Sequence, residues 1–181
     1  MIRYALIFFF ILTINSSAEI KEKIIKNLKE TNNLDFKFEQ NINGKIENGS
    51  CIVEYPKKIF CEYARSNNKI LVSDGKSLVI KTRSSYYQYS LKKTPLNFIL
   101  DKKYLIKKIS NLKGRVIDNS LINFTLIEND NTINVFFDNK TFDLIGWQNN
   151  DIYQNFNITY LSSIRKNRFI PKNKFKLPSR N

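Results

Sequence analysis

The sequence predicts an α+β fold in which one large, curved antiparallel sheet carries helices against one of its faces. Two observations lead to this prediction. Roughly ten short segments of alternating or continuous apolar residues follow one another, separated by brief polar turns. Helical periodicity is confined to one segment near the N-terminus and one in the middle of the chain. Consecutive strands with short connections form an antiparallel meander, and the helical segments then cover its apolar face.

Residues 1–18 have the pattern of a secretory signal peptide. A basic residue precedes the apolar run 4–12, and small residues at Ser16 and Ala18 favour cleavage after Ala18. A membrane anchor is the alternative, but spanning a bilayer takes about 20 apolar residues and this run is shorter. We therefore expect an exported protein whose mature chain, residues 19–181, is a single domain.

The mature chain is expected to begin with an amphipathic helix over residues 19–30. Ile20, Ile24 and Leu28 recur every fourth position, which places them on one face, and charged residues fill the rest of the surface. Such a helix packs its apolar stripe against the sheet.

The period then changes to two, which indicates strands. Asp74-Gly75 between two apolar runs is a strong hairpin signal. Thr94-Pro95-Leu96 places a hydroxyl at the N-cap and a proline at the first helical position, so a helix is expected to start there and continue in pieces to Ile109. The expected strands cover residues 35–40, 51–55, 59–64, 69–73, 77–82, 86–91, 115–119, 121–128, 132–138, 142–148 and 152–161.

Cys51 and Cys61 lie nearly symmetrically about Pro56 in one of the predicted hairpins, which can place them opposite each other on neighbouring strands. In an oxidising compartment an even pair of cysteines is typical of a disulfide. A redox-active pair has closer spacing, such as CxxC. The sequence therefore predicts a structural disulfide, with two free thiols as the alternative.

Composition narrows the possible functions. The chain has no histidine and two cysteines, which excludes Ser-His-Asp and Cys-His catalysis, His-ligated zinc and four-cysteine metal sites. No cofactor is expected. Several strands, among them residues 70–72, 78–80 and 135–137, are apolar on both faces. This excess apolar surface either adds to the core or lines a cavity for an apolar ligand, and the pattern leaves both open.

A series of short motifs extends over most of residues 20–177. It comprises FEQ at 38–40, Gly49, the Tyr55-Pro56 turn, FCEYA at 60–64, ILVSDGKSLVI at 70–80, LKKTPL at 91–96 and DLIGW at 143–147. In order and spacing these motifs resemble those of the periplasmic outer-membrane lipoprotein carrier family, LolA. The resemblance implies an unclosed β-barrel with an N-terminal helix and a mid-chain helical lid on its concave side, and an apolar cavity between them.

The resemblance also implies a function. Such proteins are periplasmic chaperones, not enzymes, that shield the acyl chains of lipoproteins between an inner-membrane ABC transporter that releases them and an outer-membrane receptor. We expect a monomer that binds no nucleic acid. The candidate lining residues, for which plain core positions are the alternative, are Phe36, Phe38, Val53, Tyr55, Ile59, Tyr63, Leu78 and Ile80, with Phe98, Ile99 and Leu100 from the lid.

One position departs from the family pattern. Members carry an arginine before the turn proline, associated with hydrogen bonding to the lid, and this chain has Tyr55 there. A tyrosine hydroxyl can still donate to a lid carbonyl, but it brings no charge. Lys57 and Lys58 are expected to project from the turn.

Residues 162–181 form a basic C-terminal segment without an acidic residue. A solvated tail is one reading, and docking onto anionic lipid head groups or an acidic partner is the other. The candidate docking residues are Arg165, Lys166, Arg168, Lys172, Lys174 and Lys176.

A lipoprotein carrier is thus the leading hypothesis. The alternative is a binding module on the same half-barrel that senses a lipidated or peptide signal. A secreted hydrolase is disfavoured because the chain lacks histidine.

Overall fold

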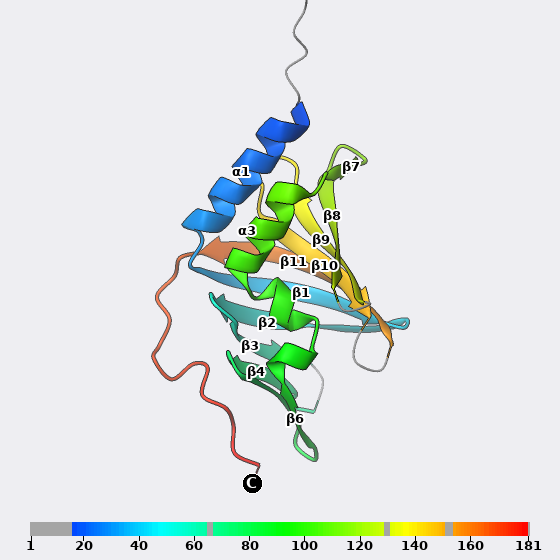
Figure 1. The fold of residues 1–181 in the computed structure, drawn as a ribbon. Helices are drawn as coiled ribbons and strands as arrows, with labels where there is room; N and C mark the ends of the chain where they lie inside the picture. Colours follow the sequence, from blue (N-terminus) through cyan, green and yellow to red (C-terminus); the bar gives the residue numbers. More distant parts are fainter. Residues whose placement is uncertain (1–15, 65–66, 129–130, 151–153, 181) are drawn as a thin grey trace, which may run out of the picture.

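The computed structural model describes residues 16–64, 67–128, 131–150 and 154–180 (Figure 1). The elements of this part are α1 (Ser16–Glu30), β1 (Asn33–Ile42), β2 (Lys45–Glu54), β3 (Lys58–Tyr63), β4 (Ile70–Asp74), β5 (Ser77–Lys81), β6 (Tyr86–Ser90), the 3-10 helix η1 (Leu91–Lys93), α2 (Leu96–Ile99), α3 (Lys102–Asn111), β7 (Arg115–Ile117), β8 (Leu121–Glu128), β9 (Asn131–Asp138), β10 (Leu144–Asn150) and β11 (Phe156–Lys166).

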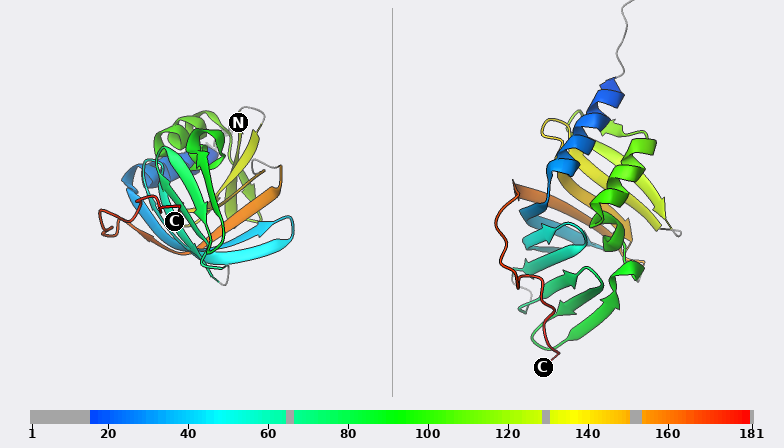
Figure 2. Two further views of the ribbon diagram at one scale, coloured as in Figure 1. Left: turned by 90° about the horizontal axis from the view of Figure 1, so that it is seen from below. Right: turned by 60° about the vertical axis from the view of Figure 1, so that its left-hand side comes forward.

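All eleven described strands form one sheet, in the order β6-β5-β4-β3-β2-β1-β11-β10-β9-β8-β7. Every neighbouring pair is antiparallel, and β1 joins the two halves by pairing with both β2 and β11. The sheet curves around the helices but does not close, because β6 and β7 lie at opposite edges (Figure 2). The predicted α+β fold with an unclosed barrel is confirmed.

The helices lie against the concave face of the sheet (Figure 1). Ile24 of α1 and Leu105 and Ile109 of α3 are fully buried in the core between helices and strands. Within the described residues, no helix combines the length and apolarity needed to cross a membrane. The predicted signal peptide, residues 1–18, falls almost wholly outside them; α1 begins at Ser16, and cleavage after Ala18 stays a prediction.

The mid-chain helical segment starts differently from the prediction. Pro95, not Thr94, is the N-cap of α2, and the Thr94 hydroxyl turns back to donate to the carbonyl of Leu91 at 2.9 Å. Asp101 separates α2 from α3 and caps α3 through a hydrogen bond from the backbone N–H of Tyr104 at 3.0 Å. The helix therefore runs in separate pieces, as expected, and ends at Asn111.

The last two strands are shifted along the chain relative to their predicted positions. Asp138 accepts hydrogen bonds from the backbone N–H groups of Lys140 and Thr141 at 2.8 and 2.7 Å, and Phe142 has φ 60°, so the turn extends further and β10 starts at Leu144. The strand predicted over residues 152–161 corresponds to β11, which begins at Phe156; positions 152 and 153 lie outside the described residues. It continues to Lys166 because its end pairs with the start of β1.

The outer face of β3–β5 is apolar as well, and the C-terminal segment covers it. Val72 and Val79 point away from the core yet are 1% and 0% exposed. Lys174 lies over the ring of Phe60 on the same face, 3.7 Å from its centroid, and Phe175 is buried. Part of the excess apolar surface in these strands is thus buried beneath the C-terminal segment, for which a solvated tail was one of the two interpretations.

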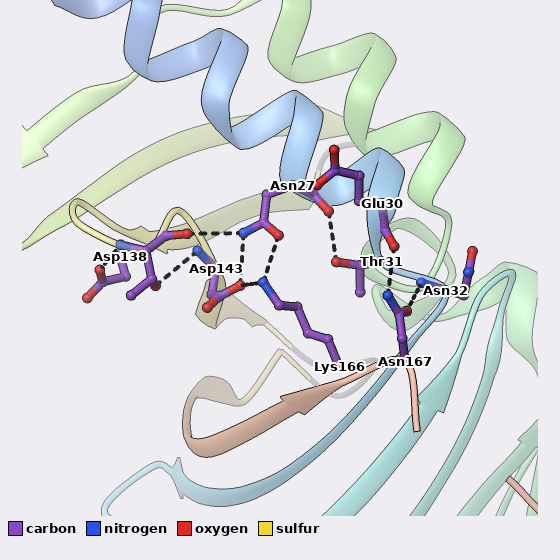
Figure 3. A network of polar contacts seen from close by, with 9 residues as sticks. Asn27, Glu30, Thr31, Asn32, Asp138, Asp143, Lys166 and Asn167 are labelled. Carbon is purple, nitrogen blue, oxygen red and sulfur yellow. Dashed lines mark hydrogen bonds and ion pairs between the residues drawn. The ribbon is translucent and has the colours of Figure 1, made fainter. Parts of the chain in front are cut away.

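The same C-terminal segment is tied to α1 by polar contacts (Figure 3). Lys166 donates to Asp143 at 2.7 Å and to the side-chain oxygen of Asn27 at 2.9 Å. Asn167 donates to the carbonyl of Glu30 at 2.9 Å. These contacts fix the end of α1 against the turn before β10 and the end of β11.

Cys51 and Cys61 face each other on β2 and β3 and form the predicted disulfide. Replacing both with alanine is expected to lower the free energy of unfolding by about 2–3 kcal/mol, because the unfolded chain gains the freedom of a ten-residue loop. Urea denaturation measures this loss. A reductant should reproduce it in the parent protein, and equal stability with and without the bridge would contradict the prediction.

Candidate lipid-binding cavity

A cavity of about 180 Å³ lies between the concave face of the sheet and residues 94–96 at the start of α2. At the roughly 30 Å³ that a water molecule occupies in the liquid, it has room for about six of them. Its lining comes from β1–β6 and the residue before β4, from residues 94–96, which form its roof, and from β10 and β11. The lining residues are Phe38, Gln40, Ile42, Cys51, Ile59, Cys61, Tyr63, Lys69, Leu71, Leu78, Ile80, Tyr89, Thr94, Pro95, Leu96, Trp147, Asn149, Asn157 and Thr159.

Most of this wall is apolar because the concave-facing positions of β2–β5 align across the strands. Cys51 pairs with Cys61, and Cys61 pairs with Leu71, so the disulfide and a leucine form one row. Phe38 and Tyr63 meet edge to face, with ring centroids 5.0 Å apart. An acyl chain placed here would contact carbon and sulfur rather than polar groups.

One end of the cavity is polar and carries a paired charge. Lys69 binds the buried carboxylate of Glu47 at 2.5 Å, and Lys45 approaches the same carboxylate at 3.2 Å. Burial raises the pKa of Glu47, but the hydrogen bonds and charges of the two lysines outweigh it, so the pKa lies below its ordinary value. Burial, with the nearby Glu47 charge, raises the pKa of the Tyr63 hydroxyl, which therefore stays protonated.

Among the described residues, no three His, Cys, Asp or Glu side chains are grouped so as to hold a metal ion.

The sequence matches the family described as outer membrane lipoprotein carrier protein LolA over residues 26–178. The chain belongs to the LolA family. No curated protein matches it.

Solved structures are similar to this LolA-family chain at low sequence identity. An uncharacterised conserved protein from Thermus thermophilus is 6% identical, with a TM-score of 0.54 over 92% of this chain and 96% of the other. A LolA superfamily protein from Nitrosomonas europaea is 9% identical, with a TM-score of 0.48 over 89% and 97%. LprF from Mycobacterium bovis is 14% identical, with a TM-score of 0.46 over 87% and 98%.

The cavity of this LolA-family protein contains only part of the predicted lining. Phe38, Ile59, Tyr63, Leu78 and Ile80 line it. The other predicted residues of the sheet do not: Phe36 and Val53 are buried in the core, and Tyr55 packs against that core. Phe36 and Val53 point to the correct face, but they lie where helices already cover the sheet.

The lid differs from the prediction in a similar way. Ile99 and Leu100 are buried in the core, and Phe98 packs against Tyr104 with ring centroids 5.2 Å apart. The roof of the cavity is instead formed by Thr94, Pro95 and Leu96. Because α2 is a single turn, the residues four positions further along the chain already lie beyond the cavity and pack against the core.

The lid of this LolA-family chain is held by the turn residue Lys57, which was expected to project from the turn. Its backbone N–H donates to the carbonyl of Leu100 at 2.9 Å, and its Nζ lies 3.2 Å from a carboxylate oxygen of Asp101. Asp101 therefore caps α3 with one oxygen and binds the turn with the other. Tyr55 contributes a ring with the ammonium group of Lys102 5.8 Å from its centroid.

The two contacts of Lys57, with Leu100 and Asp101, form a latch between the turn and the lid. Replacing Lys57 with methionine is expected to loosen this latch, because the ion pair disappears while the backbone hydrogen bond to Leu100 stays. The pair is partly exposed, so its loss should cost about 0.2–1 kcal/mol and speed amide exchange in α2 and α3 by a few-fold. Lys58→Met is the matched control, since Lys58 pairs with Glu54 away from the lid. Unchanged exchange in α3 of the Lys57 variant would contradict the latch.

The predicted basic docking residues are partly engaged within the protein. Arg165 pairs with Asp35 at 2.7 Å, Lys166 pairs with Asp143, and Lys174 lies over Phe60. The others, Arg168, Lys172 and Lys176, are exposed. A docking role for this segment stays a prediction.

Sequence reasoning missed the far side of the cavity. Trp147, Asn149, Asn157 and Thr159 come from β10 and β11 and reach the cavity because β11 pairs with β1. Their alternation in the sequence marks one sheet face, but which face lies beside Phe38 depends on a pairing between strands more than a hundred residues apart.

Proposed function

We propose that this protein is a periplasmic lipoprotein carrier that shields acyl chains in the cavity described above and delivers them to the outer membrane. The observation that supports this most directly is the largely apolar cavity between the open sheet and its helical roof. Each methylene exposed to water costs about 0.8 kcal/mol, so a lipid anchor needs such shelter to cross an aqueous space. Membership of the LolA family supports the same role.

The size of the cavity supports a roof that moves. At about 180 Å³ it is smaller than the roughly 300–1,000 Å³ of typical ligand pockets. A long acyl chain therefore requires α2 and α3 to move away from the sheet. The Lys57–Asp101 ion pair is a contact that such a movement breaks, and it is weak enough to re-form.

A release assay tests the proposal. The purified protein is incubated with inner-membrane vesicles that contain the lipoprotein-releasing ABC transporter, ATP and a lipoprotein. We expect ATP-dependent appearance of lipoprotein in the soluble fraction, and acyl chains in solvent extracts of the carrier. Acyl binding without release would favour the lipid-sensing alternative, and neither binding nor release would overturn the carrier function.

A further inference from the structure

The cavity changes from apolar to polar along the strands. Near the turn at residues 55–57 its wall consists of side chains such as Ile59 and Leu78. Toward the opposite end, Gln40 on β1 pairs with Thr159 on β11, and Thr159 pairs with Trp147 on β10. These three residues form one row of the lining. The occupant of such a cavity is an amphiphile, because one end offers mainly hydrophobic contact, with the Thr94 hydroxyl already bonded to the Leu91 carbonyl, and the other offers hydrogen bonds.

The hydrogen-bonding groups at the polar end are mostly uncharged. Gln40 donates to Asn157 at 3.0 Å and to the hydroxyl of Thr159 at 3.3 Å, and it accepts from the hydroxyl of Tyr63 at 3.3 Å. Thr159 and Asn149 are 3% and 6% exposed, yet both line the cavity. A polar ligand group that displaces one of these hydrogen bonds finds both donors and acceptors at this end of the cavity.

The charge at this end is already compensated. The Lys69 ammonium group binds Glu47 at 2.5 Å and lies 4.0 Å from the centroid of the Tyr63 ring. A carboxylate or phosphate would have to compete with Glu47 for Lys69. Neutral ester and amide carbonyls need no such exchange, so they fit the polar end better.

The polar end also opens to solvent. A second, shallower hollow adjoins the cavity and shares Lys69, Ile80 and Tyr89 with it. Its remaining lining includes Ile46 and Tyr87, which are 60% and 52% exposed. This hollow is lined on one side by the first residues of β2, Lys45–Asn48, and on the other by residues of β5 and β6.

We propose that the cavity holds its cargo in one orientation, with acyl chains toward residues 55–57, ester and amide groups beside Gln40 and Thr159, and the attached peptide leaving over the β1–β2 hairpin. The inference rests on the proposed acyl-chain binding, and it adds which end of the ligand enters first. The neutral acyl-glyceryl and peptide carbonyls of a lipid anchor supply the chemistry that the polar end recognises.

Trp147 tests this orientation because it is the only tryptophan and it lies at the polar end. The probes are two methyl stearates that carry a nitroxide either near the ester or near the terminal methyl group. One net hydrogen bond favours one orientation by roughly fivefold. We therefore expect the ester-proximal nitroxide to quench Trp147 fluorescence several-fold more strongly than the methyl-proximal one.

Two variants identify the groups responsible. In Thr159→Val the hydroxyl is lost at nearly constant shape, so the quenching ratio of the two probes should fall toward one. Thr125→Val, on the outer face of β8, is the matched control and should keep the parent ratio. Equal quenching by both probes in the parent, or stronger quenching by the methyl-proximal one, would overturn the orientation. Quenching by neither would instead count against acyl binding itself.

Discussion

Replacing Ile80 with aspartate is expected to weaken binding of an acyl chain by about tenfold or more, the equivalent of about 1.4 kcal/mol. Ile80 lies on β5, lines the cavity and is only partly buried. Without a ligand, the new carboxylate can therefore stay hydrated at the open end. An acyl chain displaces that water, and burying a carboxylate against hydrocarbon is unfavourable.

The matched control for this prediction is Ile127→Asp. Ile127 lies on β8, is 71% exposed and does not line the cavity, so the same change of charge should leave binding intact. Titration of a fluorescent acyl probe measures the dissociation constants, and circular dichroism checks that both variants are folded. A folded Ile80 variant that binds as tightly as the Ile127 variant would contradict the assignment of the cavity as the acyl site.

The antiparallel hairpins of the sheet were predictable because their signals are local, whereas the unclosed barrel was predicted from the family resemblance. The alternation in β2 and β3 and the turn between them were enough to pair Cys51 with Cys61 and to place Ile59 and Tyr63 on the same face. Hairpins join neighbouring segments, so their register follows from the turn. Everything in the β2–β5 wall of the cavity is of this kind.

The rest of the site depends on contacts that no local pattern specifies. Thr159 and Trp147 enter the cavity through the β1–β11 pairing, which connects the two ends of the chain. The roof depends on where the single turn of α2 ends, and propensity does not fix a four-residue helix. Phe175 has no periodic neighbours at all, so nothing in its segment indicated that it would be buried on the outer face.

Replacing Gly49 with alanine is expected to destabilise the protein by about 3 kcal/mol or more, at the upper end of the cost of overpacking. A Cβ atom at this position would lie 2.0 Å from the backbone oxygen of Glu62 and 2.8 Å from a ring carbon of Phe38. The backbone oxygen belongs to β3, whose hydrogen bonds to β2 hold it in place. The clash is therefore relieved only by separating the two strands.

Gly44→Ala distinguishes this steric cost from the cost of losing a glycine. Gly44 has φ 89° and no atom near its missing Cβ, so its substitution should cost only the strain of a positive φ, about 1–2 kcal/mol. Urea denaturation compares the two variants, and a Gly49 variant no less stable than the Gly44 variant would contradict the prediction. Because Phe38 and Tyr63 pair across Gly49 and form part of the cavity wall, the close approach of β2 and β3 at this glycine also sets the shape of the proposed acyl site.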